Sequence, residues 1–183
     1  YRLLEELGAV DAKRVITPLG FDLLKFPIDP RIARMLVAAK EQHCLSEMLI
    51  IASGLSVQEP WQRPHDRQGA ADEALKRFQH DESDFLTFVN VWQQCEQQKT
   101  DLTNNQYRRW LLQNFLSYLR MREWQDVYRQ LKQALHQLGW RETGEPARYE
   151  AIHRAILAGL LSHVATKDDP TGYIGARNRV MNI

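Results

Sequence analysis

Side chains that could bind a nucleic-acid backbone follow an apolar segment at residues 45–57. Ser53, Ser56 and Gln58 come near the end of this segment, and Arg63 follows between two prolines. Hydroxyl and amide groups form hydrogen bonds with ribose and phosphate oxygens, and a guanidinium binds phosphate. An arginine beside prolines loses little conformational entropy when it is fixed, because the prolines already restrict the unfolded chain. This combination predicts a site for a phosphate and ribose chain.

A second chemistry to consider is metal-assisted hydrolysis, because two His-Asp dyads stand nearby. The dyads are His65-Asp66 and His80-Asp81, and histidines with carboxylates can hold a hydrolytic metal ion. The first dyad directly follows Pro64, which places it in a turn. The second opens an acidic cluster of the kind that a helix N-terminus attracts. We therefore expect turn and capping chemistry, no metal site and no catalytic residue.

The sequence lacks the local motifs of several enzyme classes. It contains no GxxxxGK[ST] phosphate loop, no GxGxxG, no HExxH and no GxSxG. Cys44 adjoins His43, but neighbouring helix residues point about 100° apart, so we expect a buried thiol rather than a nucleophile. Two cysteines without a CxxC spacing or a signal peptide favour the cytoplasm. We expect no cofactor in this chain.

Composition excludes an overall electrostatic attraction to nucleic acid or to a membrane. The 183 residues carry 24 Lys plus Arg against 23 Asp plus Glu, so any such binding must come from local patches. No apolar run approaches the roughly 20 residues that span a bilayer, so no membrane partner is expected. The chain begins without Met and ends in an apparent strand, and we interpret it as a piece of a longer protein.

The elements that position these residues are mostly helices. Segment 45–57 is apolar on nearly every face, which is typical of a buried helix, and prolines end it. Thr17-Pro18 and Asp29-Pro30 are helix starts, Ser83 caps a further helix, and a helical pattern from residue 104 breaks near Asn114. Residues 10–16 form a predicted hairpin between two helices, and two short strands are expected after residue 166. The sequence therefore predicts a mainly α fold that ends in the first strands of a sheet.

Aromatic and basic residues at helical spacing have two interpretations. Aromatic rings could stack on bases, but beside valines and leucines at this spacing they favour a core. The basic residues could form an RNA patch or ordinary surface charge. The aromatic residues concerned are Phe85, Phe88, Trp92, Trp124 and Tyr128, and the basic ones are Arg31, Arg34, Arg108, Arg109, Arg120 and Arg122.

Short sequences along nearly the whole chain resemble the helicase-associated region of DEAH-box RNA helicases. They are LGA at 7–9, ITPLG at 16–20, FPIDPR at 26–31, LSVQEP at 55–60, SDFL at 83–86, NVW at 90–92, NFL at 114–116 and AGL at 158–160. The sequences RMREWQDV at 120–127 and GARN at 175–178 are most similar to the bacterial HrpA-type members.

This resemblance implies an organisation into three parts. Residues 1–26 would be the end of a winged helix, 27–165 a helical bundle called the ratchet domain, and 166–183 a linker and the start of an OB-fold. In the family, two RecA-like motor domains hydrolyse nucleoside triphosphate and translocate 3′ to 5′, so ATP and Mg would belong to the parent protein's motor. Carried over by motif position, RNA contacts would include Asn114 and Arg120.

Two functions stay open at this point. The first is an RNA-channel module that binds single-stranded RNA for its own RecA motor domains in the cytoplasm, with contacts from residues 53–63 and 114–120. The second is a helical scaffold that docks an activator or a ribosomal protein. Charge reversal at Arg63 should damage RNA binding in the first case and leave partner binding unchanged in the second.

Overall fold

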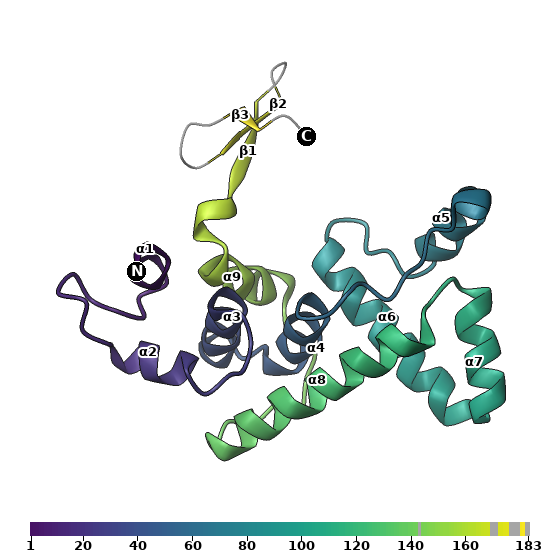
Figure 1. Cartoon of the computed structure of the whole chain (residues 1–183), viewed down its shortest axis with the longest axis horizontal. Coiled ribbons are helices and arrows are strands. Elements are labelled where there is room, and N and C mark those ends of the chain that lie inside the picture. The colour runs from purple at the N-terminus through teal and green to yellow at the C-terminus, as the bar shows by residue number, and fades with distance from the viewer. Residues whose placement is uncertain (143, 169–171, 176–179, 182–183) are drawn as a thin grey trace. The chain divides into compact units, whose positions relative to one another are not determined.

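The computed structural model describes residues 1–142, 144–168, 172–175 and 180–181, and it is mainly helical (Figure 1). This confirms the predicted fold class. In the described residues the α-helices are α1 (Arg2–Glu6), α2 (Pro18–Leu23), α3 (Pro30–Glu41), α4 (Leu45–Leu55), α5 (Gln68–Lys76), α6 (Asp84–Asp101), α7 (Asn104–Gln113), α8 (Tyr118–Gln137) and α9 (Tyr149–Gly159). Single 3-10 turns lie at η1 (His65–Arg67) and η2 (Leu161–His163). None of the described helices has the length and apolarity to cross a bilayer.

The chain forms two compact units. Residues 1–48 and 142–183 make one, here called the terminal unit, and residues 49–141 make the other, called the central unit. The unit boundaries fall at different positions from the three domains expected from the sequence, at 1–26, 27–165 and 166–183. Those domain boundaries stay a prediction, and each unit is described on its own below.

Two long helices form the core of the terminal unit. Asp29 caps α3 by accepting a hydrogen bond from the backbone N–H of Arg31, and Pro30 occupies the first turn, as the sequence predicts. α3 packs along α9, and Gly159 makes this possible. A Cβ at Gly159 would lie 2.2 Å from the carbonyl oxygen of Arg31, so only glycine allows the two backbones this close.

The N-terminal end of this unit has the predicted hairpin between α1 and α2. Val10 and Ile16 pair in an antiparallel bridge. At the tip, the carboxylate of Asp11 accepts hydrogen bonds from two backbone N–H groups, and Arg14 has a positive φ of 64°. Thr17 caps α2 by accepting from the backbone N–H of Gly20. The helix–hairpin–helix prediction is confirmed, whereas its assignment to a winged helix stays a prediction.

Three short antiparallel strands follow α9 in the order β1 (Ala165–Asp168), β2 (Gly172–Gly175) and β3 (Val180–Met181). Ala165 pairs with Gly175, and Ile174 pairs with Val180. The predicted start of an OB-fold at 166–183 lies partly outside the described residues, and it stays a prediction.

The central unit packs around aromatic rings and the second half of α4. Trp124 of α8 is fully buried, and its ring centroid lies 5.6 Å from that of Phe88 and 5.1 Å from that of Trp92. Gly54 lets these rings meet α4, because a Cβ there would lie 2.6 Å from the Phe88 ring. These rings are core, as the helical spacing predicts.

Side-chain caps and one tight turn mark where the last three helices of this unit begin and end. Ser83 caps α6, and Thr103 and Gln106 form a capping box at the start of α7. A tight turn then separates α7 from α8, and Phe115 adopts a positive φ of 54° in it. This is the break near residue 114 that the sequence predicts, and it places the first turn of α8 beside the chain that leaves α4.

Candidate nucleic-acid interface

The structure brings together the two segments in which RNA contacts are predicted. Trp61, in the chain after α4, pairs with Leu116 in an antiparallel bridge. The backbone N–H of Gln62 donates to the carbonyl oxygen of Phe115 at 2.7 Å. Residues more than 50 positions apart in sequence are thus fixed by backbone hydrogen bonds, which makes the spacing between their side chains rigid.

Arg120 adds a side-chain connection between the same two segments. Its guanidinium Nη1 donates to the carbonyl oxygen of Glu59 at 3.1 Å, and its backbone N–H donates to the hydroxyl oxygen of Ser117, the helix cap, at 3.4 Å. The N–H of Ser117 in turn donates to the carbonyl oxygen of Pro60 at 2.8 Å. A guanidinium has five N–H donors, so Arg120 can hold Glu59 and still bind an anionic oxygen.

Ser56 and Gln58 lie at the end of α4 as the sequence predicts. Ser56 is half-buried, and its hydroxyl donates to the carbonyl oxygen of Ala52 at 2.7 Å. This bond uses the proton and leaves the oxygen as an acceptor. Gln58 is exposed. We call the surface formed by Ser56, Gln58, Arg63 and Arg120 the loop–α8 surface.

Arg63 lies in this region but is held by a carboxylate. Its Nε and Nη2 each donate to one oxygen of Asp72 in α5, both at 2.7 Å. The guanidinium lowers the pKa of the Asp72 carboxyl through these hydrogen bonds, and Asp72 raises the pKa of Arg63. The sequence predicts Arg63 as an available cation, whereas the structure leaves mainly Nη1 for a phosphate. The sequence could not show this pair, because Asp72 lies nine residues away on another element.

Ser53 lies in the core and differs from the accessible polar residue that the sequence analysis expects. It has no exposed surface, its hydroxyl donates to the carbonyl oxygen of Leu49 at 2.6 Å, and its oxygen accepts from Nε1 of Trp124 at 2.9 Å. The physical reason is the apolar character of α4 on all faces, which buries its serine with the rest. Ser53 is therefore not a candidate for direct contact with RNA.

Asn114 also has a local structural role. It is 8% exposed and forms the C-cap of α7, where its side-chain amide donates to the carbonyl oxygen of Trp110 at 2.8 Å. This side chain shapes the turn that presents Phe115 and the first turn of α8. Asn114 therefore helps to position the loop–α8 surface.

Arg67 is a cation near this surface that the sequence does not predict as part of the site. The guanidinium carbon of Arg67, in η1, lies 5.3 Å from the centre of the Phe115 ring. Arg67 is exposed and 3.9 Å from the carboxylate of Asp66. The signal for it in the sequence is its place in the polar turn after Pro64, although only the fold shows that this turn meets Phe115.

The residues of the alternative chemistries occupy turns and the core. His65 and Asp66 lie in the 3-10 turn η1, and the ring of His80 accepts from the backbone N–H of Glu82. Within the described ranges, no three His, Cys, Asp or Glu side chains gather to hold a metal ion. Both cysteines are buried, and burial raises the thiol pKa of each to about 12.

Comparison with known proteins agrees with this architecture. Residues 29–88 match the family described as helicase associated domain (HA2), ratchet-like. The chain is 48% identical over 188 residues to the ATP-dependent RNA helicase HrpA of Escherichia coli (strain K12), and 43% identical over 185 residues to the HrpA homolog of Haemophilus influenzae. It is 31% identical over 169 residues to the pre-mRNA-splicing factor ATP-dependent RNA helicase prp22 of Schizosaccharomyces pombe.

These matches define residues 29–88 as a ratchet-like, helicase-associated domain. More particularly, the chain as a whole is similar to the HrpA-type RNA helicases. The matches cover 100%, 97% and 92% of this chain, in the order given above. The chain spans 14% of the length of each of these relatives.

Proposed function

We propose that this chain is the RNA-channel module of an ATP-dependent 3′-to-5′ RNA helicase. In this proposal the loop–α8 surface binds the backbone of single-stranded RNA, and RecA motor domains of the parent protein supply ATP hydrolysis with Mg. The observation that carries the proposal is the set of hydrogen bonds that joins residues 59–62 to residues 115–120, because it holds Arg120 beside the polar end of α4.

The chemistry of the loop–α8 surface favours contacts that ignore base sequence. Arg120 and Nη1 of Arg63 offer N–H donors to phosphate oxygens, and Gln58 offers an amide to a ribose or a base edge. Such contacts position a strand without reading it. A motor that moves along RNA of any sequence needs a module of this kind.

The experiment that tests the proposal is binding of a single-stranded RNA to the 183-residue chain across a salt series. Each phosphate neutralised on a single strand contributes about −0.7 to the slope of log affinity against log salt. We expect Arg120→Gln to weaken binding several-fold and to make the slope shallower by roughly that amount. Arg109→Gln is the matched control, because Arg109 is an exposed arginine on α7 and is not one of the residues that define the loop–α8 surface.

Equal loss of RNA affinity in the Arg120 and Arg109 variants would contradict the proposal, because binding would then follow total charge. Absence of RNA binding at low salt by a folded wild-type chain would also contradict it for this chain. Either result leaves the helicase-associated fold unaffected.

A second candidate function, a scaffold for an activator or ribosomal protein, is favoured by one observation. Leu112 of α7 and Leu119 of α8 are 69% and 66% exposed, on either side of the turn at Phe115. Contiguous exposed apolar surface marks sites of protein contact, and these two leucines are candidates for such a surface. A Leu112→Ser, Leu119→Ser double variant that keeps RNA affinity but loses a partner protein would support the scaffold function.

A further inference from the structure

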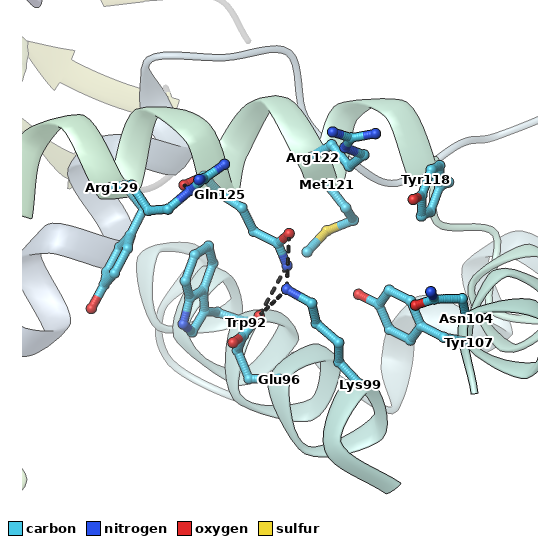
Figure 2. A pocket seen from close by; sticks show the side chains of 11 residues that line it. Trp92, Glu96, Lys99, Asn104, Tyr107, Tyr118, Met121, Arg122, Gln125 and Arg129 are labelled. Carbon is cyan, nitrogen blue, oxygen red and sulfur yellow. Dashed lines mark hydrogen bonds and ion pairs between the residues drawn. The ribbon is translucent and has the colours of Figure 1, made fainter. Parts of the chain in front are cut away.

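A cleft of about 450 Å³ lies in the central unit among α6, α7 and α8. This volume is within the range of small-molecule sites, about 300–1,000 Å³. Figure 2 shows Glu96 and Lys99 of α6, Tyr107 of α7, and Met121 and Gln125 of α8 pointing toward one another. We call this the α6–α8 cleft. Its lining residues are Trp92, Glu96, Lys99, Asn104, Tyr107, Tyr118, Met121, Arg122, Gln125, Tyr128 and Arg129.

The α6–α8 cleft is separate from the loop–α8 surface. Arg120 bonds to Glu59 on one side of α8, whereas Arg122 lines the cleft. Residues two apart on a helix point about 200° apart, so the two arginines lie on nearly opposite faces. A ligand in the cleft therefore occupies a different place from an RNA strand on the loop–α8 surface.

Aromatic rings line the inner part of the cleft. The rings of Trp92 and Tyr128 lie 4.5 Å apart at an angle of 34°, and Trp92 also packs on the core ring of Trp124. Met121 is buried between the two ends of the cleft. The core holds Trp92 in place and Trp92 supports the half-exposed ring of Tyr128, while Nζ of Lys132 lies 5.8 Å from the centre of the Tyr128 ring. A planar group would stack on Tyr128 by displacing the flexible side chain of Lys132.

A network of polar side chains crosses the middle of the cleft, as Figure 2 shows. Nε2 of Gln125 donates to Oε1 of Glu96 at 2.9 Å, and Oε1 of Gln125 accepts from Nζ of Lys99 at 3.3 Å. Lys99 also lies 3.8 Å from Glu96. The three side chains fix one another, so they present donors and an acceptor in a defined arrangement beside the rings.

Two arginines lie near Tyr118, which lines one part of the cleft. The guanidinium carbon of Arg108 lies 4.5 Å from the centre of the Tyr118 ring, and its Nη2 donates to the Tyr118 hydroxyl at 3.5 Å. Arg122 lines the same cleft as Tyr118, whereas Arg108 adjoins the cleft through its contact with Tyr118. The hydrogen bond from Arg108 and the positive charges of both arginines lower the pKa of the Tyr118 phenol. Two neighbouring guanidiniums can bind a phosphate group.

We propose that the α6–α8 cleft binds one nucleoside phosphate, with the base against Tyr128 and the phosphate between Arg108 and Arg122. The source of this unit is either a free nucleotide or one nucleotide of a single-stranded RNA. The proposal does not depend on RNA binding at the loop–α8 surface, because a free nucleotide alone tests it.

The network in the middle of the cleft favours a nucleotide over an acidic peptide. The carboxylate of Glu96 repels the carboxylates of such a peptide, whereas it accepts a hydrogen bond from the exocyclic amino group of a base. Lys99 and Gln125 supply donors for ring nitrogens and ribose hydroxyls. An acidic peptide would use the arginines but neither Glu96 nor Tyr128.

The test is a titration of the ¹⁵N-labelled chain with adenosine 5′-monophosphate and, separately, with a short oligoadenylate. We expect AMP to shift the indole N–H signal of Trp92 and the amide signals of Tyr118 and Gln125. Arg122→Gln and Arg108→Gln should each weaken AMP binding at least about fivefold. Arg109→Gln is the control, because it removes the same charge from the residue next to Arg108 without touching the cleft.

Each outcome has a definite meaning. Shifts with AMP alone assign the site to a free nucleotide, and stronger shifts with oligoadenylate assign it to a nucleotide within RNA. Equal shifts with inorganic phosphate, or with a tetraglutamate peptide, would overturn the proposal. So would unchanged spectra with both nucleotides, or equal weakening by Arg109→Gln. Loss of RNA binding in Arg120→Gln with AMP binding intact would separate the two surfaces.

Discussion

The indole Nε1 of Trp124 donates a hydrogen bond of 2.9 Å to the hydroxyl oxygen of Ser53, and both side chains are completely buried. The same indole N–H also reaches the carbonyl oxygen of Ile50 at 3.1 Å. This contact joins α8 to α4 in the middle of the central unit. It therefore fixes the relation between the two elements that form the loop–α8 surface.

Ser53→Ala should destabilise the central unit by about 1–2 kcal/mol, because a buried donor loses one of its acceptors and Ile50 satisfies it only in part. Urea unfolding measures the change. Ser56→Ala is the comparison, since its hydroxyl is half-buried and bonds within α4 only. An equal loss of stability in both variants would show that the hydrogen bond from Trp124 adds nothing to the stability.

Gly54→Ala should destabilise the central unit, although it adds only one methyl group. The new methyl group would lie 2.6 Å from the Phe88 ring and 3.1 Å from that of Trp124, and overpacking of this kind costs about 1–3 kcal/mol. Gly69→Ala in α5 is the control, because a Cβ there meets nothing within 4 Å and should stabilise the helix by about 0.5–1 kcal/mol. Thermal melts of both variants test the opposite signs.

The free energy of unfolding should fall as pH rises above 9. Burial raises the thiol pKa of Cys44 and Cys95 from 9.0 to about 12, and it raises the pKa of Tyr107 in the same direction. Below pH 9 the folded and the unfolded chain both keep the thiol protons, so the thiols do not lower the free energy of unfolding. Above pH 9 the unfolded chain loses these protons while the folded chain keeps them, so the free energy of unfolding falls by about 1.4 kcal/mol per thiol for each pH unit.

Urea unfolding at pH 8 and pH 10 measures this dependence on pH. The Cys44→Ala, Cys95→Ala variant is the control, because it removes both thiols while the other titrating groups stay. Its loss of stability between the two pH values should be smaller than that of the wild type. Equal losses would show that the thiols do not titrate differently in the folded state.

Local patterns in the sequence predict most of the helices, because caps and breaks depend on neighbouring residues. Thr17, Asp29 and Ser83 each cap the helix that the sequence expects. The same kind of local pattern predicts the break near Asn114. Pairings between distant elements leave no such pattern. The sequence therefore predicts where α4 and α8 run, but not that Trp124 uses Ser53 as its acceptor.

The candidate site shows the same division. Motif position in a family that the sequence resembles predicts RNA contacts in residues 53–63 and 114–120, and the structure places part of these ranges side by side. The availability of each side chain does not follow, since it depends on contacts made in the fold. The sequence does not predict the α6–α8 cleft, because its arginines have the pattern of ordinary surface charge and its aromatic residues have the pattern of a hydrophobic core.

The pair of Arg63 and Asp72 gives the sharpest prediction for RNA binding. Asp72 occupies two of the donors of Arg63, and its negative charge opposes an approaching phosphate. Asp72→Asn removes that charge, so we expect RNA affinity to rise about two- to fivefold and the salt slope to steepen towards one further phosphate contact. Because the pair is exposed, the free energy of unfolding should change little.

Glu73→Gln is the matched control for this prediction. Glu73 neighbours Asp72 on α5, and its carboxylate pairs with Lys76 rather than with Arg63. An increase in RNA affinity in both variants would mean that only the total charge matters. An increase in Asp72→Asn that disappears when Arg63→Gln is added would show that Asp72 restrains Arg63, and would place Arg63 at the RNA strand.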